Sequence, residues 1–262
     1  MDFIGYVASV CIGLILGLLG GGGSILSIPI LVYIFHFDVV LASAYSLFVV
    51  GITSLVGAIP KYKEHLVDVK TGLVFGLPSI LSIFVTRTWI VHAIPDVIWQ
   101  TQYFSLSKRL FLLGLFAVLM VLASISMIRE RQSIKRDAER VRPVLIILEG
   151  LLIGCLTGLV GAGGGFLIIP ALVFLTGLPF KTAVGTSLLI IAVNSLTGFA
   201  GDLLNYTMDW TFLLTITGLA IVGILLGHAL SHRMSSLKLR KLFGWFILVM
   251  GIWILTREIL QS

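Results

Sequence analysis

Two glycine clusters interrupt otherwise apolar stretches of the chain, Gly20–Gly23 and Gly161–Gly165. Each is followed by a segment that can restart a helix, residues 24–33 and 165–175. A restarting helix directs several amide N–H groups and its positive dipole end at the break. Because glycine has no side chain to keep a ligand away, the clusters predict binding of a small anion by backbone donors. Two such ends facing each other would form a cage that needs no fixed basic side chain.

Two other interpretations of the glycines exist. They could serve only close packing of helices in lipid, as small-residue patterns do. They also resemble the glycine loops of nucleotide-binding proteins. Neither cluster has the Lys-Ser/Thr ending of those loops, however, and the flanking segments are apolar and of membrane length. We therefore exclude the nucleotide interpretation and prefer anion binding, since four contiguous glycines exceed what packing needs.

Hydroxyl and amide side chains follow each cluster and can complete the coordination. Any single Ser or Thr can instead bond the carbonyl one turn back in its own helix. Asn194 stands out, because a carboxamide near the middle of a membrane needs partners or water. Ser54, Ser195 and Thr197 belong to the same polar segments. The candidate substrate-binding residues are Gly20, Gly21, Gly22, Gly23, Ser24, Ser46, Thr53, Gly161, Ala162, Gly163, Gly164, Gly165, Thr186, Ser187 and Asn194.

Few titratable side chains lie within the apolar runs. Glu149 is our candidate for ion coupling, although it is close enough to the start of its run to reach the cytoplasmic surface. His228 and His232 are four residues apart, either as a proton-sensitive pair or as the interfacial end of a helix. Cys11 and Cys155 are isolated thiols without a CxxC motif or a histidine at ligand spacing. We expect no metal, no cofactor and no catalytic residue.

An internal repeat relates the two halves of the chain. Residues 13–68 align without a gap with residues 154–209, and roughly 18 of about 56 positions are identical. GLILGLLGGGGSILSIPILV from Gly13 matches GCLTGLVGAGGGFLIIPALV from Gly154, with Pro29 opposite Pro170. We divide the chain into a first repeat, residues 1–128, a basic linker, residues 129–142, and a second repeat, residues 143–262.

The composition is that of a membrane protein. Hydrophobic residues make up 58% of the 262 residues and charged residues 11%, with a mean hydropathy of +1.11. Apolar runs long enough to cross about 30 Å of hydrocarbon recur along the chain. The net charge of +6 comes from basic residues in short loops between these runs, so it indicates topology and not nucleic-acid binding.

The basic residues predict the topology. The linker carries six Arg and Lys residues and should be cytoplasmic. Residues 144–177 would form one helix of roughly 50 Å, so the glycines must reverse the chain. This reversal places Lys61, Lys63 and Lys70 inside and Arg87, Lys108 and Arg109 outside, with Arg233, Lys238, Arg240 and Lys241 inside. We expect an all-α, polytopic transmembrane bundle of two inverted-topology repeats, each with a glycine-broken hairpin.

The paired motifs GLxGGGGSxLxxPxL and GLVGAGGGFLxxPxLV, with AVGTSL at residues 183–188, resemble the TauE/SafE family of sulfite and organosulfur-anion exporters. The resemblance covers nearly the whole chain. It implies a permease for sulfite, an organosulfonate or a related small anion, driven by an ion gradient. It carries over to Gly20–Ser24, Gly161–Gly165, Pro29, Pro170, Thr186 and Ser187. Where the second half has Gly185-Thr186-Ser187, the first has Ala44-Tyr45-Ser46, so matching side-chain ligands are not assured.

The leading hypothesis is a secondary transporter in a cell membrane, the inner membrane where there are two. It would move a small sulfur-containing anion by alternating access, coupled to protons or sodium. A non-transporting membrane scaffold or assembly partner is the alternative. An intramembrane enzyme is disfavoured, because the apolar runs show no catalytic constellation. The expected partners are the anion, the coupling ion, the lipid bilayer and, as one option, further copies of the chain, with no nucleic acid.

Overall fold

The computed structural model describes residues 2–21, 23–101, 104–128, 143–203 and 205–261. The linker at 129–142 and Gly22 lie outside the described residues. Six described spans are long and apolar enough to cross a membrane. They are α3 (Val39–Lys63), α4 (Val69–Val85) with η1 (Thr86–Ile90) and α5 (Val91–Ala93), α6 (Lys108–Ile128), α9 (Phe180–Asp202), α10 (Trp210–Ser231) and α11 (Ser236–Gln261). The predicted helical membrane protein is thereby confirmed.

The shorter apolar helices form two pairs, each separated by a glycine cluster. They are α1 (Asp2–Leu19) with α2 (Gly23–Tyr33), and α7 (Pro143–Val160) with α8 (Gly165–Leu175). A Cβ atom on Gly5 of α1 would lie 2.2 Å from the ring of Phe35, just beyond the end of α2. The chain thus returns to the start of α1, which is the reversal that the glycines predict.

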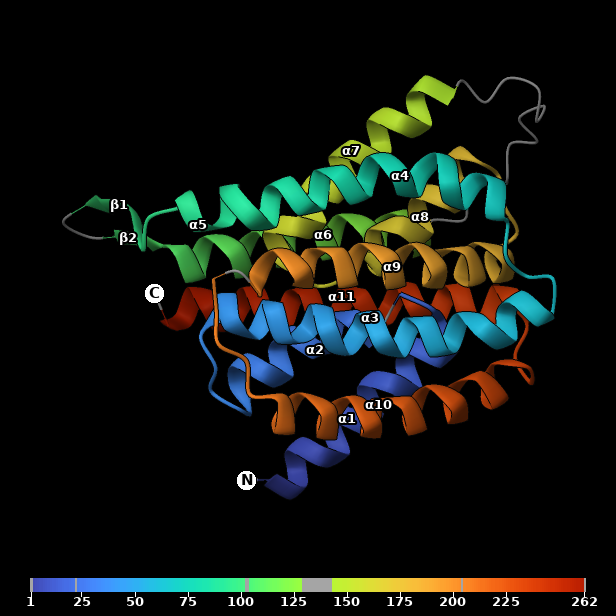
Figure 1. Cartoon of the computed structure of the whole chain (residues 1–262), viewed down its shortest axis with the longest axis horizontal. Coiled ribbons are helices and arrows are strands. Elements are labelled where there is room, and N and C mark those ends of the chain that lie inside the picture. The colour runs from blue at the N-terminus through green and yellow to red at the C-terminus, as the bar shows by residue number, and fades with distance from the viewer. Residues whose placement is uncertain (1, 22, 102–103, 129–142, 204, 262) are drawn as a thin grey trace.

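The two halves exchange packing partners. α1 of the first half packs along α10 of the second, and α7 of the second packs along α4 of the first. Equivalent glycines make these approaches: a Cβ on Gly13 would lie 1.8 Å from the carbonyl oxygen of Ala220, and one on Gly154 would lie 2.5 Å from that of Ser79. α3 and α9 pack together and run in opposite directions (Figure 1). Neither half therefore completes its core alone.

The two ends of the bundle differ in the elements that they carry. The hairpin end carries β1 (Val97–Thr101) and β2 (Phe104–Ser107), an antiparallel pair that the sequence did not predict. The histidine end is where α3 and α10 end and α4 and α9 begin (Figure 1).

Equivalent contacts connect the helices near both ends. The hydroxyl of Tyr45 in α3 accepts from the N–H of Asp209 at 3.0 Å, and that of Thr186 in α9 accepts from the N–H of Asp68 at 2.8 Å. Tyr45 and Thr186 occupy the same position of the repeat, as do the two aspartates. Both aspartate side chains also cap the helix that follows. The substitution of Tyr for Thr thus preserves the contact.

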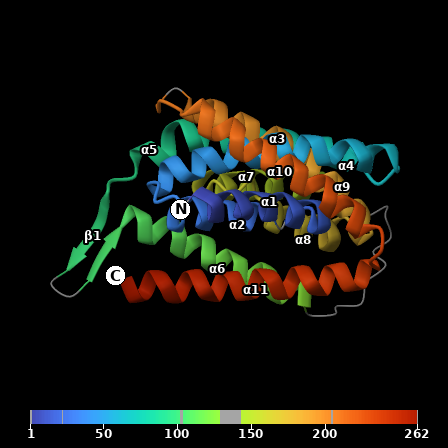
Figure 2. The same cartoon turned by 90° about the horizontal axis from the view of Figure 1, so that it is seen from below.

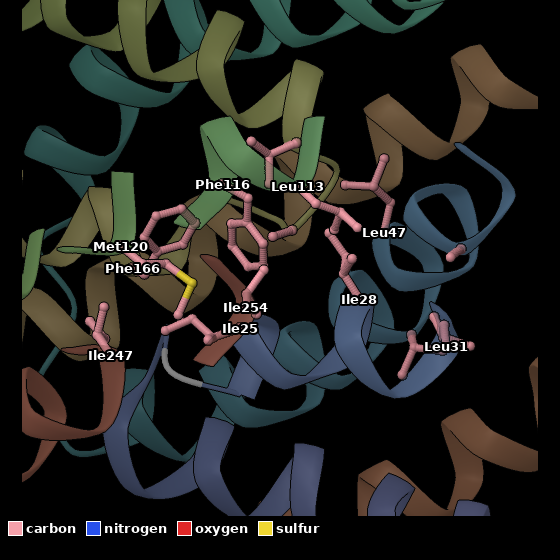
Figure 3. Packing of buried hydrophobic residues seen from close by; sticks show 14 of the residues in the cluster. Ile25, Ile28, Leu31, Leu47, Leu113, Phe116, Met120, Phe166, Ile247 and Ile254 are labelled. Carbon is pink, nitrogen blue, oxygen red and sulfur yellow. The ribbon is translucent and has the colours of Figure 1, made fainter. Parts of the chain in front are cut away.

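The apolar core joins α2 and α8 to the outer helices α6 and α11. Figure 3 shows Ile25 and Ile28 of α2 near Phe116 of α6 and Ile254 of α11. The rings of Phe116 and Phe166, the latter from α8, meet edge to face with centroids 5.4 Å apart. α6 and α11 pack together along one side of the molecule (Figure 2). Both short helices that follow the glycine turns are therefore held in fixed positions.

Candidate functional site

The glycine clusters form turns that only glycine adopts readily. Gly20 and Gly161, equivalent in the repeat, have φ of +74° and +76°. In the second turn Gly163 and Gly164 also lie in the left-handed region, at +65° and +71°. A side chain costs roughly 1–2 kcal/mol in this conformation. The predicted breaks are therefore turns with specific backbone geometry, and tight helix packing alone does not require them.

The two turns meet inside the protein. A Cβ on Gly21 would lie 2.2 Å from the carbonyl carbon of Gly165, and one on Gly165 would lie 2.3 Å from the Cα of Gly21. The N-termini of α2 and α8 are therefore adjacent. The helices then diverge: Tyr33 at the end of α2 bonds Glu258, and Phe174 near the end of α8 contacts Arg240 at the start of α11. Both positive helix ends thus converge on one place.

Unpartnered hydroxyls border the second turn. The Oγ of Ser195 lies 2.8 Å from the position of a Cβ on Gly163, and the Oγ1 of Thr157 lies 2.2 Å from that of a Cβ on Gly164. Both hydroxyls are buried and lack a hydrogen-bond partner among the described residues, as does that of Ser54, the repeat equivalent of Ser195. A buried hydroxyl without a partner is costly, which makes these three groups candidates for ligand contact.

The hydroxyls selected from the sequence have other roles. All are buried. The Oγ atoms of Ser46 and Ser27 are 2.5 Å apart, and Ser24 donates to the carbonyl of Gly21 at 2.6 Å. Thr53 and Ser187 donate to carbonyls of their own helices at 2.5 and 2.8 Å, which is the alternative to ligand binding that their residue types allowed. Together with the hydrogen bond from Asp68 N–H to Thr186 near the histidine end, these bonds give the candidate hydroxyls partners inside the protein.

Asn194 has the protein partner that a carboxamide at this depth needs. Its Nδ2 donates to the Oγ of Ser79 in α4 at 2.7 Å. That bond connects α9 to α4 in the region where α7 also packs against Ser79. Ala162, also a candidate, is buried in the second turn at 1% exposure. Thr157 was not selected from the sequence, because a threonine within an apolar run gives no signal of its neighbours.

An ion pair that the sequence did not reveal lies beside the second turn. Arg87, which we counted as an outside loop cation, is fully buried in the π-helical turn η1 and pairs with Asp202 at the end of α9. Its Nε donates to Asp202 Oδ2 at 2.9 Å. Its Nη1 donates to Ser43 Oγ at 2.9 Å, and that oxygen lies 2.9 Å from the position of a Cβ on Gly161.

The sequence predicts an anion cage without a fixed basic side chain, and the structure adds a buried cation close to it. One side chain, that of Ser43, separates the Arg87 guanidinium from the turn. The positive charge is matched by the Asp202 carboxylate, which accepts from both Nε and Nη2 of the arginine. The sequence pattern missed the pair because 115 residues separate its members.

The histidine end carries a second polar cluster. Lys61, 5% exposed, lies 3.7 Å from Glu64 Oε2 and donates to Ser231 at 3.4 Å. The other Glu64 oxygen is 3.0 Å from His228 Nε2 and 2.9 Å from His232 Nε2. The two histidines therefore face a carboxylate, which the sequence did not indicate.

Glu149, the coupling candidate, is not part of either cluster. It is half-buried on α7, nine residues before Gly158, which corresponds to about 13 Å along a helix. The structure thus places it away from the glycine turns.

The fold and the site define a class of protein. Polytopic apolar helices, with broken pairs that meet inside, are the plan of a multi-pass membrane transporter. The profile of the family described as Sulfite exporter TauE/SafE matches residues 6–254. The chain belongs to this family.

Curated relatives carry the same general description. A probable membrane transporter protein of Xylella fastidiosa is 32% identical, covering 94% of this chain and 92% of its own. YunE of Bacillus subtilis, also named a probable membrane transporter protein, is 27% identical, with coverage of 94% and 96%. A third, from Methanocaldococcus jannaschii, is 27% identical over 94% of each chain. No solved structure matches the chain.

Proposed function

We propose that this protein is a secondary transporter of a small sulfur-containing oxyanion, such as sulfite or an organosulfonate, in the cell membrane. The anion binds where the two glycine turns meet, and the two halves, as inverted repeats, expose it alternately to the two sides. The observation that carries the proposal is the contact of Gly21 with Gly165 beside unpartnered buried hydroxyls. The family supports the class of substrate by its description.

The helix ends supply an electrostatic reason for choosing an anion. The first N–H groups of α2 and α8 have no partners within their helices, and each N-terminus carries roughly half a positive charge. Because the two helices begin side by side and diverge, their dipoles add at this point. An anion is favoured here without a basic side chain in direct contact, which keeps binding weak enough for release.

The unpartnered hydroxyls favour an oxyanion over other anions. Ser195 and Thr157 can each donate one hydrogen bond, and a sulfur oxyanion offers several acceptor oxygens. Bonds from a neutral donor to a charged acceptor contribute about 1.5–3 kcal/mol each. Chloride would gain less, since one spherical ion cannot match separate donors with separate oxygens. We therefore expect sulfite and sulfonates to compete better than chloride.

Pairing between the halves supports the alternating movement. α3 and α9 are antiparallel, and equivalent residues make equivalent contacts at Tyr45–Asp209 and Thr186–Asp68. Two units of opposite direction can exchange conformations, so that closing one end opens the other. A proton or sodium gradient would then determine the direction of net flux.

Uptake into liposomes by purified variants tests the proposal. Gly163→Ala places a methyl group 2.8 Å from Ser195 Oγ, whereas Gly177→Ala meets nothing within 4 Å. Both glycines have positive φ, at +65° and +70°, so the two variants share the backbone strain of about 1–2 kcal/mol. We expect Gly163→Ala to lose most sulfite uptake and Gly177→Ala to retain it, with folding of both checked by melting temperature.

Equal uptake by the two glycine variants would contradict a role for the turn. If Gly163→Ala fails to fold, Ser195→Ala replaces it, because removing an unpartnered hydroxyl does not destabilise the protein. Protein that folds but transports no anion would favour the scaffold alternative.

A further inference from the structure

Three side chains converge at the histidine end with the spacing of metal ligands. His228 and His232 lie one turn apart at the end of α10, and Glu64 comes from the connection between α3 and α4. The two Nε2 atoms are 3.2 Å apart, and each lies within 3.0 Å of Glu64 Oε1. Three potential ligand atoms therefore form a nearly equilateral triangle.

This triangle matches one face of a tetrahedral metal site. Zinc binds imidazole nitrogen and carboxylate oxygen at about 2.0–2.1 Å, which separates tetrahedral ligand atoms by about 3.3 Å. The three separations of 2.9, 3.0 and 3.2 Å need to widen only slightly. Two histidines four residues apart on a helix are also a recurrent zinc-binding arrangement.

We propose that Glu64, His228 and His232 bind a divalent transition-metal ion, for which Zn²⁺ is the best fit. Two imidazoles and one carboxylate are the donor set of several three-residue zinc sites, with the fourth position left to water or another ligand. The His232 side chain is 52% exposed, so the ion has access from solvent. Neither cysteine contributes to this site.

Although two basic residues lie near the cluster, one oxygen of the Glu64 carboxylate faces the imidazoles and can bind an ion. Lys61 pairs with the opposite oxygen of the Glu64 carboxylate, Oε2, at 3.7 Å, and leaves Oε1 facing the imidazoles. Arg233 follows His232 directly in sequence. The Nδ1 of His228 has no hydrogen-bond partner within the described part of the chain. A hydrogen bond from the second ring nitrogen of a histidine ligand strengthens zinc binding about 10- to 100-fold. Because His228 lacks this bond among the described residues, we expect zinc to bind weakly enough to exchange.

A bound ion would connect elements that must separate for this end to open. Glu64 immediately follows α3 of the first half, and the histidines end α10 of the second half, which packs on both α3 and α1. Zinc would therefore hold the histidine end closed and inhibit transport. This consequence rests on the proposed function, whereas binding of the ion does not.

Zinc titration of the purified, chelator-treated full chain tests binding without any transport assay. The background is Cys11→Ser with Cys155→Ser, which removes thiols as competing ligands. We expect one Zn²⁺ per chain by calorimetry and a rise in melting temperature. Glu64→Gln and His228→Ala should each weaken binding at least about 100-fold, more than an outer-shell partner contributes. His36→Ala, at an exposed histidine outside the cluster, should leave it unchanged.

Two results would overturn the site. One is no binding with Zn²⁺ up to about 1 mM, where a site with a Kd near 100 μM would be mostly occupied. The other is equal affinity in the background protein and in the Glu64 and His228 variants. If Zn²⁺ binds as expected but leaves anion uptake unchanged, the inhibitory role is wrong and the site itself stands.

Discussion

The two ends of the bundle use the same repeat positions for different chemistry. At the hairpin end Arg87 pairs with Asp202, and both side chains are fully buried. The repeat offset relates Asp202 to Lys61 and, continued along the chain, Arg87 to His228. At the histidine end these positions cannot form an ion pair directly, and Glu64 bridges them instead.

The two ends therefore differ in the side-chain contacts that hold their helices together. A buried guanidinium–carboxylate pair resists separation, because each charge would be left without its partner. The histidine end instead gathers a lysine, a carboxylate and two histidines, the cluster for which we propose metal binding. In the proposed transport cycle, opening the hairpin end would therefore cost more than opening the histidine end.

Breaking the buried pair should have the largest effect. Arg87→Ala leaves the Asp202 carboxylate buried and unpaired, which costs about 3–5 kcal/mol. We expect a large fall in melting temperature in detergent. Arg109→Ala is the control, because that arginine is 47% exposed and its buried partner Glu258 keeps the hydrogen bond from Tyr33, so the loss should be smaller, about 1 kcal/mol.

Removing both charges separates stability from function. Arg87→Leu with Asp202→Leu should recover much of the stability lost in Arg87→Ala, since a buried ion pair is often replaceable by apolar side chains. Uptake should stay low, because the closure would no longer be an ion pair. Equal losses in Arg87→Ala and Arg109→Ala would mean that the pair is not the main stabilising contact of its end.

Introducing an arginine–aspartate pair at the histidine end tests whether charge alone distinguishes the two ends. Lys61→Asp with His228→Arg would reproduce the guanidinium–carboxylate chemistry at the histidine end. Each single change should destabilise the protein, and the double variant should regain about 1–3 kcal/mol as coupling energy, measured by a double-mutant cycle on melting. Additive losses would show that the two ends differ in geometry as well as in charge.

The architecture could be predicted from the sequence more completely than the contacts between side chains. Residues 144–177 would form a straight helix longer than the membrane is thick, so the chain must reverse there. The repeat predicts the same reversal in the first half. The direct contact of Gly21 with Gly165 could be anticipated from the inverted plan alone. The left-handed angles follow from glycine itself, which adopts them without steric cost.

Contacts between residues far apart in the chain could not be predicted from the sequence. Arg87 looked like a loop cation because no local pattern indicates that a π-helical turn directs it inward against Asp202. Glu64 gave no sign of facing two histidines at the end of α10. Thr53 and Ser187 were chosen as ligands by residue type, yet their hydroxyls bond their own helices, a competition that only geometry decides.

The most direct test of anion binding is the melting temperature of Ser195→Ala during titration with sulfite. Of the variants proposed, this one should change the stability of the ligand-free protein least. Without ligand, this variant should melt at or slightly above the wild-type temperature, since its buried hydroxyl has no described partner. Wild-type protein should gain about 2.7 kcal/mol at sulfite concentrations of 100 times the Kd. Ser124→Ala, where the buried hydroxyl bonds its own helix, should gain as much as wild type.

The account predicts that Ser195→Ala needs roughly 10- to 150-fold more sulfite for the same rise, the equivalent of one hydrogen bond to a charged ligand. Identical titration curves for Ser195→Ala and wild type, or no rise with any sulfur oxyanion, would contradict anion binding at the glycine turns.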